Sequence, residues 1–239
     1  MSAIYGQRAE LYDRIYHWKD YAGEAARVRA LLQAEGVPDA ARLLDAACGT
    51  GSHLQHLQRW YEVAGFDGSQ EMLAVARRKL TGVPLWQSDL RALGVERPFQ
   101  AVVCLFSSIG YLQGEAALRE GARALAGALA PGGVLLVEPW FTPQQWQAGR
   151  PHLSHYSSPE LCLARATVAE REGDLSINVM HWLVAAEGRP VEHWTERHAL
   201  WLCPHETLLR AFQEAGLRAR LEPEGLMPDR GLLVARRPA

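Results

Sequence analysis

The chain has 239 residues, of which 48% are hydrophobic, and its formal net charge is −2. This length fits one α/β domain, or one domain with a modest insertion. The small net charge lacks the basic footprint of nucleic-acid-binding proteins, which disfavours nucleic acid as a partner. No stretch is apolar and long enough to span a membrane or to form the apolar part of a signal peptide, so we expect no membrane partner.

The cysteines give a first indication of the cellular compartment. They stand far apart, without any C-x-x-C pair, at Cys48, Cys104, Cys162 and Cys203. This pattern favours reduced thiols over a disulfide framework or a zinc site. We therefore expect a cytoplasmic protein.

Residues 5–21, YGQRAELYDRIYHWKDY, are unusually rich in aromatic side chains. The aromatic residues are Tyr5, Tyr12, Tyr16, Trp18 and Tyr21. Two interpretations stay open. The segment could be an amphipathic helix that caps an edge of a sheet, or a lid whose aromatic faces and phenol groups contact a cationic cofactor.

The sequence RLLDAACGTGSHL, at Arg42–Leu54, combines the end of a buried strand, a loop of small residues and the start of a helix. Ala47, Gly49 and Gly51 allow a tight turn and a close approach of the backbone to a ligand. A P-loop is excluded because no G-K-[S/T] follows, and a leucine replaces the third glycine of a dinucleotide fingerprint. The remaining pattern, D-x-A-C-G-T-G from Asp45, resembles motif I of the class I S-adenosylmethionine (SAM) methyltransferases. The alternative is a tight βα turn without a ligand.

The next strand ends in a group suited to a ribose. Val63–Phe66 is a short strand followed by Asp67, 18 positions after Gly49. A ribose-binding carboxylate is expected about 20 positions after the glycine loop. Gly68 and Met72 follow at the start of the next helix.

A third strand, at residues 83–87, is followed by Asp89 and Leu90. An acidic and an apolar side chain at a strand end can bond an adenine amino group and pack against its ring. The basic run Arg77–Lys79 before this strand is expected to be the solvated end of a helix.

Phe99–Leu105 is nearly all apolar, which is typical of a buried parallel strand. Phe106 and Tyr111 follow at its carboxyl end, where ligands of open α/β sheets lie, so both face cofactor and substrate in this interpretation. A helix over residues 115–130 leads to a fifth strand, Val134–Val137, and then to Trp140.

After residue 141 the pattern becomes that of an antiparallel meander. Its three β-like runs are residues 161–171, 175–186 and 191–202. A helix at residues 204–216 and a hairpin of residues 217–222 and 231–236 close the chain, and the hairpin loop holds Arg230.

The alternation of five strands with helices predicts the α/β class. We expect a doubly wound, mostly parallel, seven-stranded Rossmann-like sheet with an antiparallel β insertion after the fifth strand. The chain is expected to be a single domain, 1–239. Its parts are an N-terminal lid and helix (1–38), the SAM-binding core (39–140), the antiparallel insertion (141–202), and the C-terminal helix with the closing hairpin (203–239).

Five stretches together resemble the nucleotide-linked amino-sugar N,N-dimethyltransferases, which complete sugars of the desosamine and mycaminose type. They are KDYAGEA (19–25), LLDAACGTGSHL (43–54), LFSSIGYL (105–112), VEPWF (137–141) and DRGLL (229–233). The resemblance spans almost the whole chain and implies SAM as cofactor, a homodimer, and a dTDP-linked amino sugar as substrate. The chain departs from the family in GFDGS for G-L-E-L-S, in a missing third aromatic at VEPWF, and in LMPDRG for G-P-S-G-R-G.

The leading hypothesis is therefore a SAM-dependent N-methyltransferase acting on the amino group of a small molecule, most specifically a dTDP-linked amino sugar. A neutral amine would attack the sulfonium methyl group in line and leave S-adenosylhomocysteine, and a dedicated base is not required. Two alternatives stay open. One is a methyltransferase with another small acceptor, such as a hydroxyl, a carboxylate or a different nitrogen, and the other is a SAM-binding protein without turnover. An NAD enzyme is the least favoured.

This hypothesis assigns the site residues. Those expected at the cofactor are Tyr12, Lys19, Asp45, Ala47, Gly49, Gly51, Asp67, Gly68, Met72, Asp89, Leu90 and Phe106. Tyr111 is the first candidate for contact with the amine, and Tyr16 is the second. The substrate site is expected to hold Tyr111, Trp140, His181 and Arg230, with Arg230 on the diphosphate because guanidinium binds phosphate bidentately.

The histidines do not indicate a metal site. His181, His193 and His198 lie in the insertion, but their spacing matches no metal-ligand motif, and we expect no metal. His193 and His198 stand at an odd and an even position, so in a regular strand their side chains face opposite sides. His53 and His56 are expected to be solvated.

Overall fold

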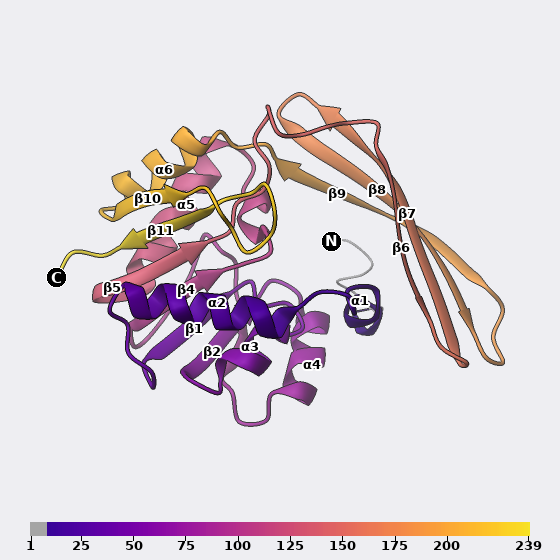
Figure 1. Cartoon of the computed structure of the whole chain (residues 1–239), viewed down its shortest axis with the longest axis horizontal. Coiled ribbons are helices and arrows are strands. Elements are labelled where there is room, and N and C mark those ends of the chain that lie inside the picture. Colours follow the sequence, from indigo (N-terminus) through magenta and orange to yellow (C-terminus); the bar gives the residue numbers. More distant parts are fainter. Residues whose placement is uncertain (1–8) are drawn as a thin grey trace.

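The computed structural model describes residues 9–239, so Tyr5 lies outside the described residues. Its centre is a seven-stranded sheet in the order β10-β11-β5-β4-β1-β2-β3 (Figure 1). The parallel strands are β1 (Arg42–Ala46), β2 (Glu62–Asp67), β3 (Leu85–Gln87), β4 (Phe99–Cys104) and β5 (Leu129–Val137). An antiparallel hairpin, β10 (Arg218–Glu222) and β11 (Leu232–Arg236), completes the sheet against β5. The predicted fold class is confirmed.

Helices cover both faces of this sheet because its parallel strands are apolar on both sides (Figure 1). Leu43 and Leu44 are successive residues of β1, point to opposite faces, and are both fully buried. Leu43 packs in a cluster with α2 (Tyr21–Ala34), α3 (Ser52–Leu57) and α4 (Gln70–Lys79). Leu44 packs in the other cluster, with α5 (Gly114–Ala128) and α6 (His205–Glu214).

The start of β5 differs from the prediction. The strand begins at Leu129 and not at Val134, and it includes Pro131, Gly132 and Gly133, which lie between the predicted helix and the predicted strand. Its pairing with β4 shifts register between Phe99 and Ala101. Proline and glycine usually interrupt a strand, but they are tolerated at such an irregularity, and the predicted start was therefore too late.

The insertion is a second sheet of four antiparallel strands, beside the carboxyl ends of β1 and β4 (Figure 1). Its strands are β6 (Pro151–Ser157), β7 (Leu161–Glu172), β8 (Leu175–Ala186) and β9 (Glu192–Trp201). The prediction contained three of them and missed β6. The sequence of β6, PHLSHYS, lacks β-branched residues, and it forms a strand because β7 offers it an edge to pair with.

A short helix, α1 (Glu10–Ile15), lies between the two sheets (Figure 1). Ile15 is fully buried in a cluster with Leu163 and Trp182 of the insertion. Tyr12, one turn earlier, packs with Met72 of α4. The helix therefore bridges the core and the insertion, which favours the lid interpretation over a cap on the sheet edge.

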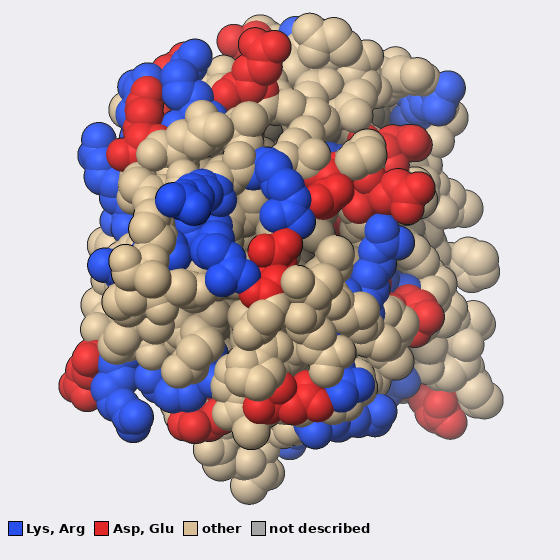
Figure 2. Space-filling model, turned by 60° about the vertical axis from the view of Figure 1, so that its left-hand side comes forward, with Lys and Arg blue, Asp and Glu red and all other residues tan. Residues whose placement is uncertain are grey.

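The charge distribution on the surface does not indicate a binding partner. On the face shown in Figure 2, basic and acidic side chains are interspersed, so this face carries no field of a single sign. Within residues 9–239, no helix is long and apolar enough to cross a membrane.

Candidate active site

The loop after β1 has the backbone conformation that its small residues allow. Ala47, Gly49 and Gly51 all have positive φ, at 60°, 56° and 75°. A Cβ atom at Gly51 would lie 2.5 Å from a methyl carbon of Leu80, so only glycine fits there. Gly51 therefore shapes the loop by packing and does not line a cavity among the described residues.

Asp67, at the end of β2, is hydrogen-bonded to this loop. Its Oδ2 accepts the N–H of Gly49 at 2.8 Å, and its Oδ1 accepts the N–H of Ser69 at 2.9 Å. Burial raises the pKa of Asp67, and the backbone N–H groups oppose that rise. Asp45, buried at the end of β1, has a pKa raised well above its ordinary value by burial and by the nearby charge of Asp67.

Two cavities meet at this loop. One, of about 760 Å³, lies between the ends of β2 and β3 and the turn η2 (Ser108–Tyr111). The other, of about 480 Å³, lies between α1, the loop and the inner face of the insertion. Six residues line both: Tyr12, Ala47, Gly49, Ser108, Tyr111 and His198. These six mark the junction of the two cavities.

The larger cavity brings together the residues predicted for the nucleoside. It is lined by Asp67, Gly68, Met72, Asp89 and Leu90, with Phe66 beneath them. Three strand ends meet here because the parallel strands end at the same edge of the sheet. Its volume and its mix of one apolar wall with carboxylates suit a nucleoside.

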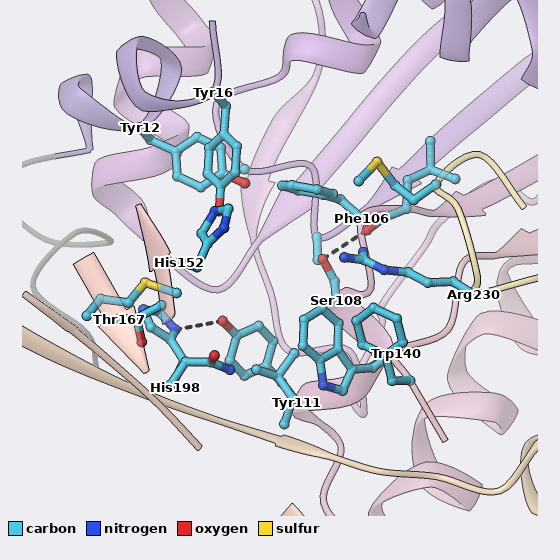
Figure 3. Close-up of a pocket in the computed structure, with 18 of the residues that line it drawn as sticks. Tyr12, Tyr16, Phe106, Ser108, Tyr111, Trp140, His152, Thr167, His198 and Arg230 are labelled. Atoms are coloured by element: carbon cyan, nitrogen blue, oxygen red, sulfur yellow. Dashed lines mark hydrogen bonds between the residues drawn. The ribbon is translucent and has the colours of Figure 1, made fainter. Parts of the chain in front are cut away.

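The smaller cavity has aromatic walls (Figure 3). Tyr12 and Tyr16 enter it from the N-terminal segment, with ring centroids 4.7 Å apart. The edge of the Phe106 ring meets Tyr16 at 5.1 Å. Tyr111 enters from the opposite side, and its Oη lies 2.8 Å from Nδ1 of His198 (Figure 3).

One wall of the smaller cavity holds a buried arginine. Arg230 lies over the rings of Trp140 and Phe141, at 4.7 and 5.1 Å, and donates to Oγ of Ser107 at 2.9 Å. Burial lowers the pKa of Arg230, and the carboxylate of Glu138 opposes that change. Trp140 and Arg230 thus both line this cavity, as predicted for the substrate site.

A second buried arginine was missed in the sequence. Arg165 of β7 is 5% exposed and donates to Oη of Tyr16 at 3.0 Å. Its Nε has no hydrogen-bond partner among the described residues. An arginine inside the apolar run LCLARATV was the available signal, because a charged residue on the inner face of a strand needs a reason.

His181 is a correction. It is exposed on the outer face of the insertion, where its ring stacks on that of His193 at 5.7 Å, and it does not line either cavity. His198, three residue pairs further along the same ladder, faces inward and lines both cavities. The parity of the strand separated these histidines, but the sequence does not reveal which side of the insertion faces the core.

Lys19 and His53 also lie differently from the prediction. Lys19 is buried against Glu24, and its Nζ lies 4.4 Å from the centroid of the Phe106 ring, without lining a cavity itself. His53 is buried and its Nε2 lies 2.7 Å from Glu24, so the prediction that it is solvated was wrong. Glu24 thereby ties α2, α3 and the segment between the first two helices together.

Asp13 joins the lid to the loop, a role that sequence reasoning missed. Its Oδ1 accepts the hydroxyl of Thr50 at 2.6 Å, and its Oδ2 accepts Nζ of Lys79 at 2.8 Å. Ser52 also donates to Asp13. Lys79 is therefore an anchor for α1 and not a solvated helix end as predicted.

The comparisons with known proteins agree with this geometry. Residues 43–133 match the family model of a methyltransferase domain. The dTDP-3-amino-3,6-dideoxy-alpha-D-glucopyranose N,N-dimethyltransferase of Streptomyces fradiae is 39% identical over 223 residues, which are 92% of this chain and 87% of that protein. The dTDP-3-amino-3,4,6-trideoxy-alpha-D-glucopyranose N,N-dimethyltransferase of Streptomyces venezuelae is 37% identical over 229 residues, 95% of this chain and 96% of that protein.

Solved structures agree over nearly the whole chain. DesVI from Streptomyces venezuelae has a TM-score of 0.91 and 36% identity, and the match covers 98% of this chain and 99% of that one. A SAM-bound amino pentose methyltransferase from Micromonospora echinaspora has a TM-score of 0.85 and 34% identity over 97% of both chains. The glycine loop, Asp67 and the nucleoside-sized cavity fit SAM as the cofactor. The chain therefore belongs to the SAM-dependent methyltransferases, in the family of the dTDP-amino-sugar N,N-dimethyltransferases.

Proposed function

We propose that this enzyme methylates the amino group of a dTDP-linked amino sugar to the dimethylamino stage. The observation that carries this proposal is the junction of the two cavities at Tyr12, Tyr111 and the glycine loop. The larger cavity suits the nucleoside of SAM, and SAM supplies an electrophilic methyl group on a sulfonium. The smaller cavity is left for the acceptor, which would meet the methyl group at the junction.

An amine is the acceptor that this junction suits. Holding nitrogen, carbon and sulfur in line can supply about 7–11 kcal/mol of the barrier without any covalent step by the protein. The amine must be neutral, and for an alkyl amine with a pKa of about 10.4 that costs about 4.6 kcal/mol at pH 7. The aromatic rings of Tyr12, Tyr16 and Phe106 stabilise a cation close by, which fits a site that holds a sulfonium and produces an ammonium.

We assign the diphosphate of the substrate to the two buried arginines of the smaller cavity. Arg230 was predicted for this role, and Arg165 adds a second guanidinium from β7 of the insertion. Arg165 forms no ion pair within the described part of the chain, where its hydrogen bonds go to Tyr16 and Ser154. A buried guanidinium without a carboxylate partner favours a bound anion such as diphosphate.

We also propose that two copies of the chain pair through the outer face of the insertion. Leu153, Val168 and Leu183 lie on that face of three neighbouring strands, and they are 63%, 49% and 50% exposed. Exposed apolar side chains on one face of a sheet can mark an interface, and the family resemblance implies a homodimer.

The four cysteines are free, which supports the reducing cytoplasm as the compartment.

The test is direct. The purified protein is incubated with methyl-labelled SAM and dTDP-linked 3-amino and 4-amino sugars, and products are identified by mass spectrometry and NMR. Label on the sugar nitrogen, with one and then two methyl groups, is expected. Transfer to a hydroxyl or carboxylate would replace this function with another acceptor. Tight binding of S-adenosylhomocysteine without any transfer would indicate a SAM-binding protein.

A further inference from the structure

We propose that His198, backed by Glu196, takes up the proton that the substrate amine must lose, and that it acts through the hydroxyl group of Tyr111. This inference rests on the proposed function, because it concerns the amine at the same junction. Each methyl transfer leaves an ammonium, so a second transfer to the same nitrogen requires that a proton leave the site.

The three side chains form a line that leads away from the junction. Tyr111 lines both cavities and is 42% exposed. Its Oη lies 2.8 Å from Nδ1 of His198, and Nε2 of His198 lies 3.6 Å from Oε2 of Glu196. His198 and Glu196 are 5% and 3% exposed. The line thus runs from a group that can reach the substrate to a carboxylate that water does not reach.

Glu196 fixes the tautomer of the imidazole. Neither of its carboxylate oxygens has a hydrogen-bond partner among the described residues, and the His198 ring lies beside it, with Nε2 at 3.6 Å from Oε2. A buried carboxylate without partners is costly, and a positive charge beside it lowers that cost. A carboxylate 3.6 Å from Nε2 favours the tautomer that carries its proton there, and this tautomer leaves Nδ1 to accept from Tyr111.

The proton transfer balances with these groups alone. A bond between the substrate nitrogen and its proton breaks as a bond from that proton to Oη of Tyr111 forms. The original proton of Tyr111 moves to Nδ1 of His198, so the phenol stays neutral and the imidazole becomes a cation beside Glu196. The electron pair stays on the nitrogen, which can then form its bond to the methyl carbon while the old bond's pair stays on sulfur. The imidazolium returns its proton to water through Tyr111 once the cavity opens.

Besides His198, the insertion lines the smaller cavity with His152 of β6 and Arg165 of β7, which lie at least two strands away from β9 and bond to Ser154 and Tyr16. β9 packs against η2 and β8. η2 contributes Tyr111, and β8 sets Asn178 opposite His198 and Met180 opposite Glu196, neither of which titrates. Arg197, between the two on β9, lines the larger cavity, and its guanidinium pairs with Glu172.

The test compares the pH profiles of kcat for the wild-type enzyme and His198→Gln, with SAM and a dTDP-linked amino sugar both saturating. Glutamine can still accept from Tyr111 but cannot take up a proton. We expect kcat to fall about 100-fold at pH 7 and to recover toward the wild-type value near pH 9.5, where the amine loses its proton to water. The acidic limb of the profile therefore moves to higher pH. Tyr111→Phe is expected to move it in the same direction.

The control is His193→Gln, on the same strand but on its exposed face, which should keep the wild-type profile. An equal loss of kcat at every pH for His198→Gln, or no loss, would overturn the proposal, because a merely structural role has no reason to depend on pH. Imidazole added to His198→Ala provides a second readout, with rescue at pH 7 but not at pH 9.5 expected. Failure of the proposed function is distinct, since the wild-type enzyme would then not methylate the sugar at any pH.

Discussion

At the scale of single residues, the site depends on buried carboxylates whose surroundings oppose their charge. Asp45 and Asp67 end neighbouring strands, and Glu138 is fully buried at the end of β5. Burial raises the pKa of each. Backbone N–H groups of Phe106 and Met227 bond to Glu138, at 2.7 and 2.9 Å. Glu138 thereby holds the start of the Phe106 turn against the C-terminal loop.

Asp67→Ala tests the binding of the nucleoside. A hydrogen bond to a charged group contributes about 1.5–3 kcal/mol, so the Kd of SAM is expected to rise about 10–100-fold. Titration calorimetry with SAM and S-adenosylhomocysteine measures it. Asp39→Asn, an exposed carboxylate far from the cavities, is the control. An unchanged Kd for Asp67→Ala would show that the ribose lies elsewhere.

Asp45→Asn tests the cost of a buried charge. The pKa of Asp45 is raised in the folded state, so the folded protein binds its proton more tightly than the unfolded chain does. Folding therefore loses stability as pH rises above the ordinary value of 3.8 toward the raised pKa. Asparagine removes this loss, and we expect a larger free energy of unfolding at pH 8 and a smaller difference between pH 5 and pH 8. Urea denaturation at both pH values measures it, and a lower stability at pH 8 would contradict the expectation.

At the scale of elements, α1 is the piece that completes the site. It is six residues long, too short to be stable alone, so its position depends on its contacts. On one side it is held by the polar contacts of Asp13, and on the other by the burial of Ile15. These two contacts position Tyr12 and Tyr16 in the smaller cavity.

Asp13→Ala should release this lid from the glycine loop. It removes the hydrogen bond from Thr50 and the ion pair with Lys79, and we expect the KM for SAM to rise about tenfold, in line with the loss of about 1.5 kcal/mol for partly exposed charged hydrogen bonds. Glu10→Gln on the same helix is the control. Its ion pair with Arg78 is largely exposed, and such pairs contribute about 0–1 kcal/mol. Steady-state kinetics at varied SAM distinguish the two, and an equal KM for both variants would rule out the role of Asp13.

At the scale of the whole molecule, a parallel sheet supplies the strand ends and a second sheet closes the space above them (Figure 1). The inner face of the insertion carries side chains that line the smaller cavity, among them Arg165 and His198. Its outer face carries apolar side chains. One face of this sheet thus lines the cavity, and the other face is available for the proposed homodimer.

Leu183→Lys tests that homodimer. A charge in an apolar contact is costly, so the variant is expected to be monomeric at concentrations where the wild-type chain is dimeric. Light scattering after size exclusion measures the mass. Glu187→Lys, in the β8–β9 turn and off this face, is the control. A monomeric wild-type chain, or a dimer that Leu183→Lys leaves intact, would contradict the proposed interface.

The fold could be predicted because its signals are local. The pairs of buried leucines in β1, the small residues before α3 and the cap at Ser69 each act over a few residues. The gathering of Gly49, Asp67 and Asp89 around one cavity also followed, because parallel strands bring their carboxyl ends to the same edge of a sheet. The side chains that the insertion contributes to the smaller cavity could not be predicted in this way. Which face of the insertion looks inward depends on how α1 and η2 dock against it, and no local pattern contains that information for His181 or Arg165.

The unlike attachments of α1 have a consequence for salt. Dissolved ions screen the ion pair between Asp13 and Lys79, but they do not weaken the burial of Ile15 in its apolar cluster. A higher ionic strength therefore weakens the attachment of α1 to the glycine loop and leaves its attachment to the insertion in place.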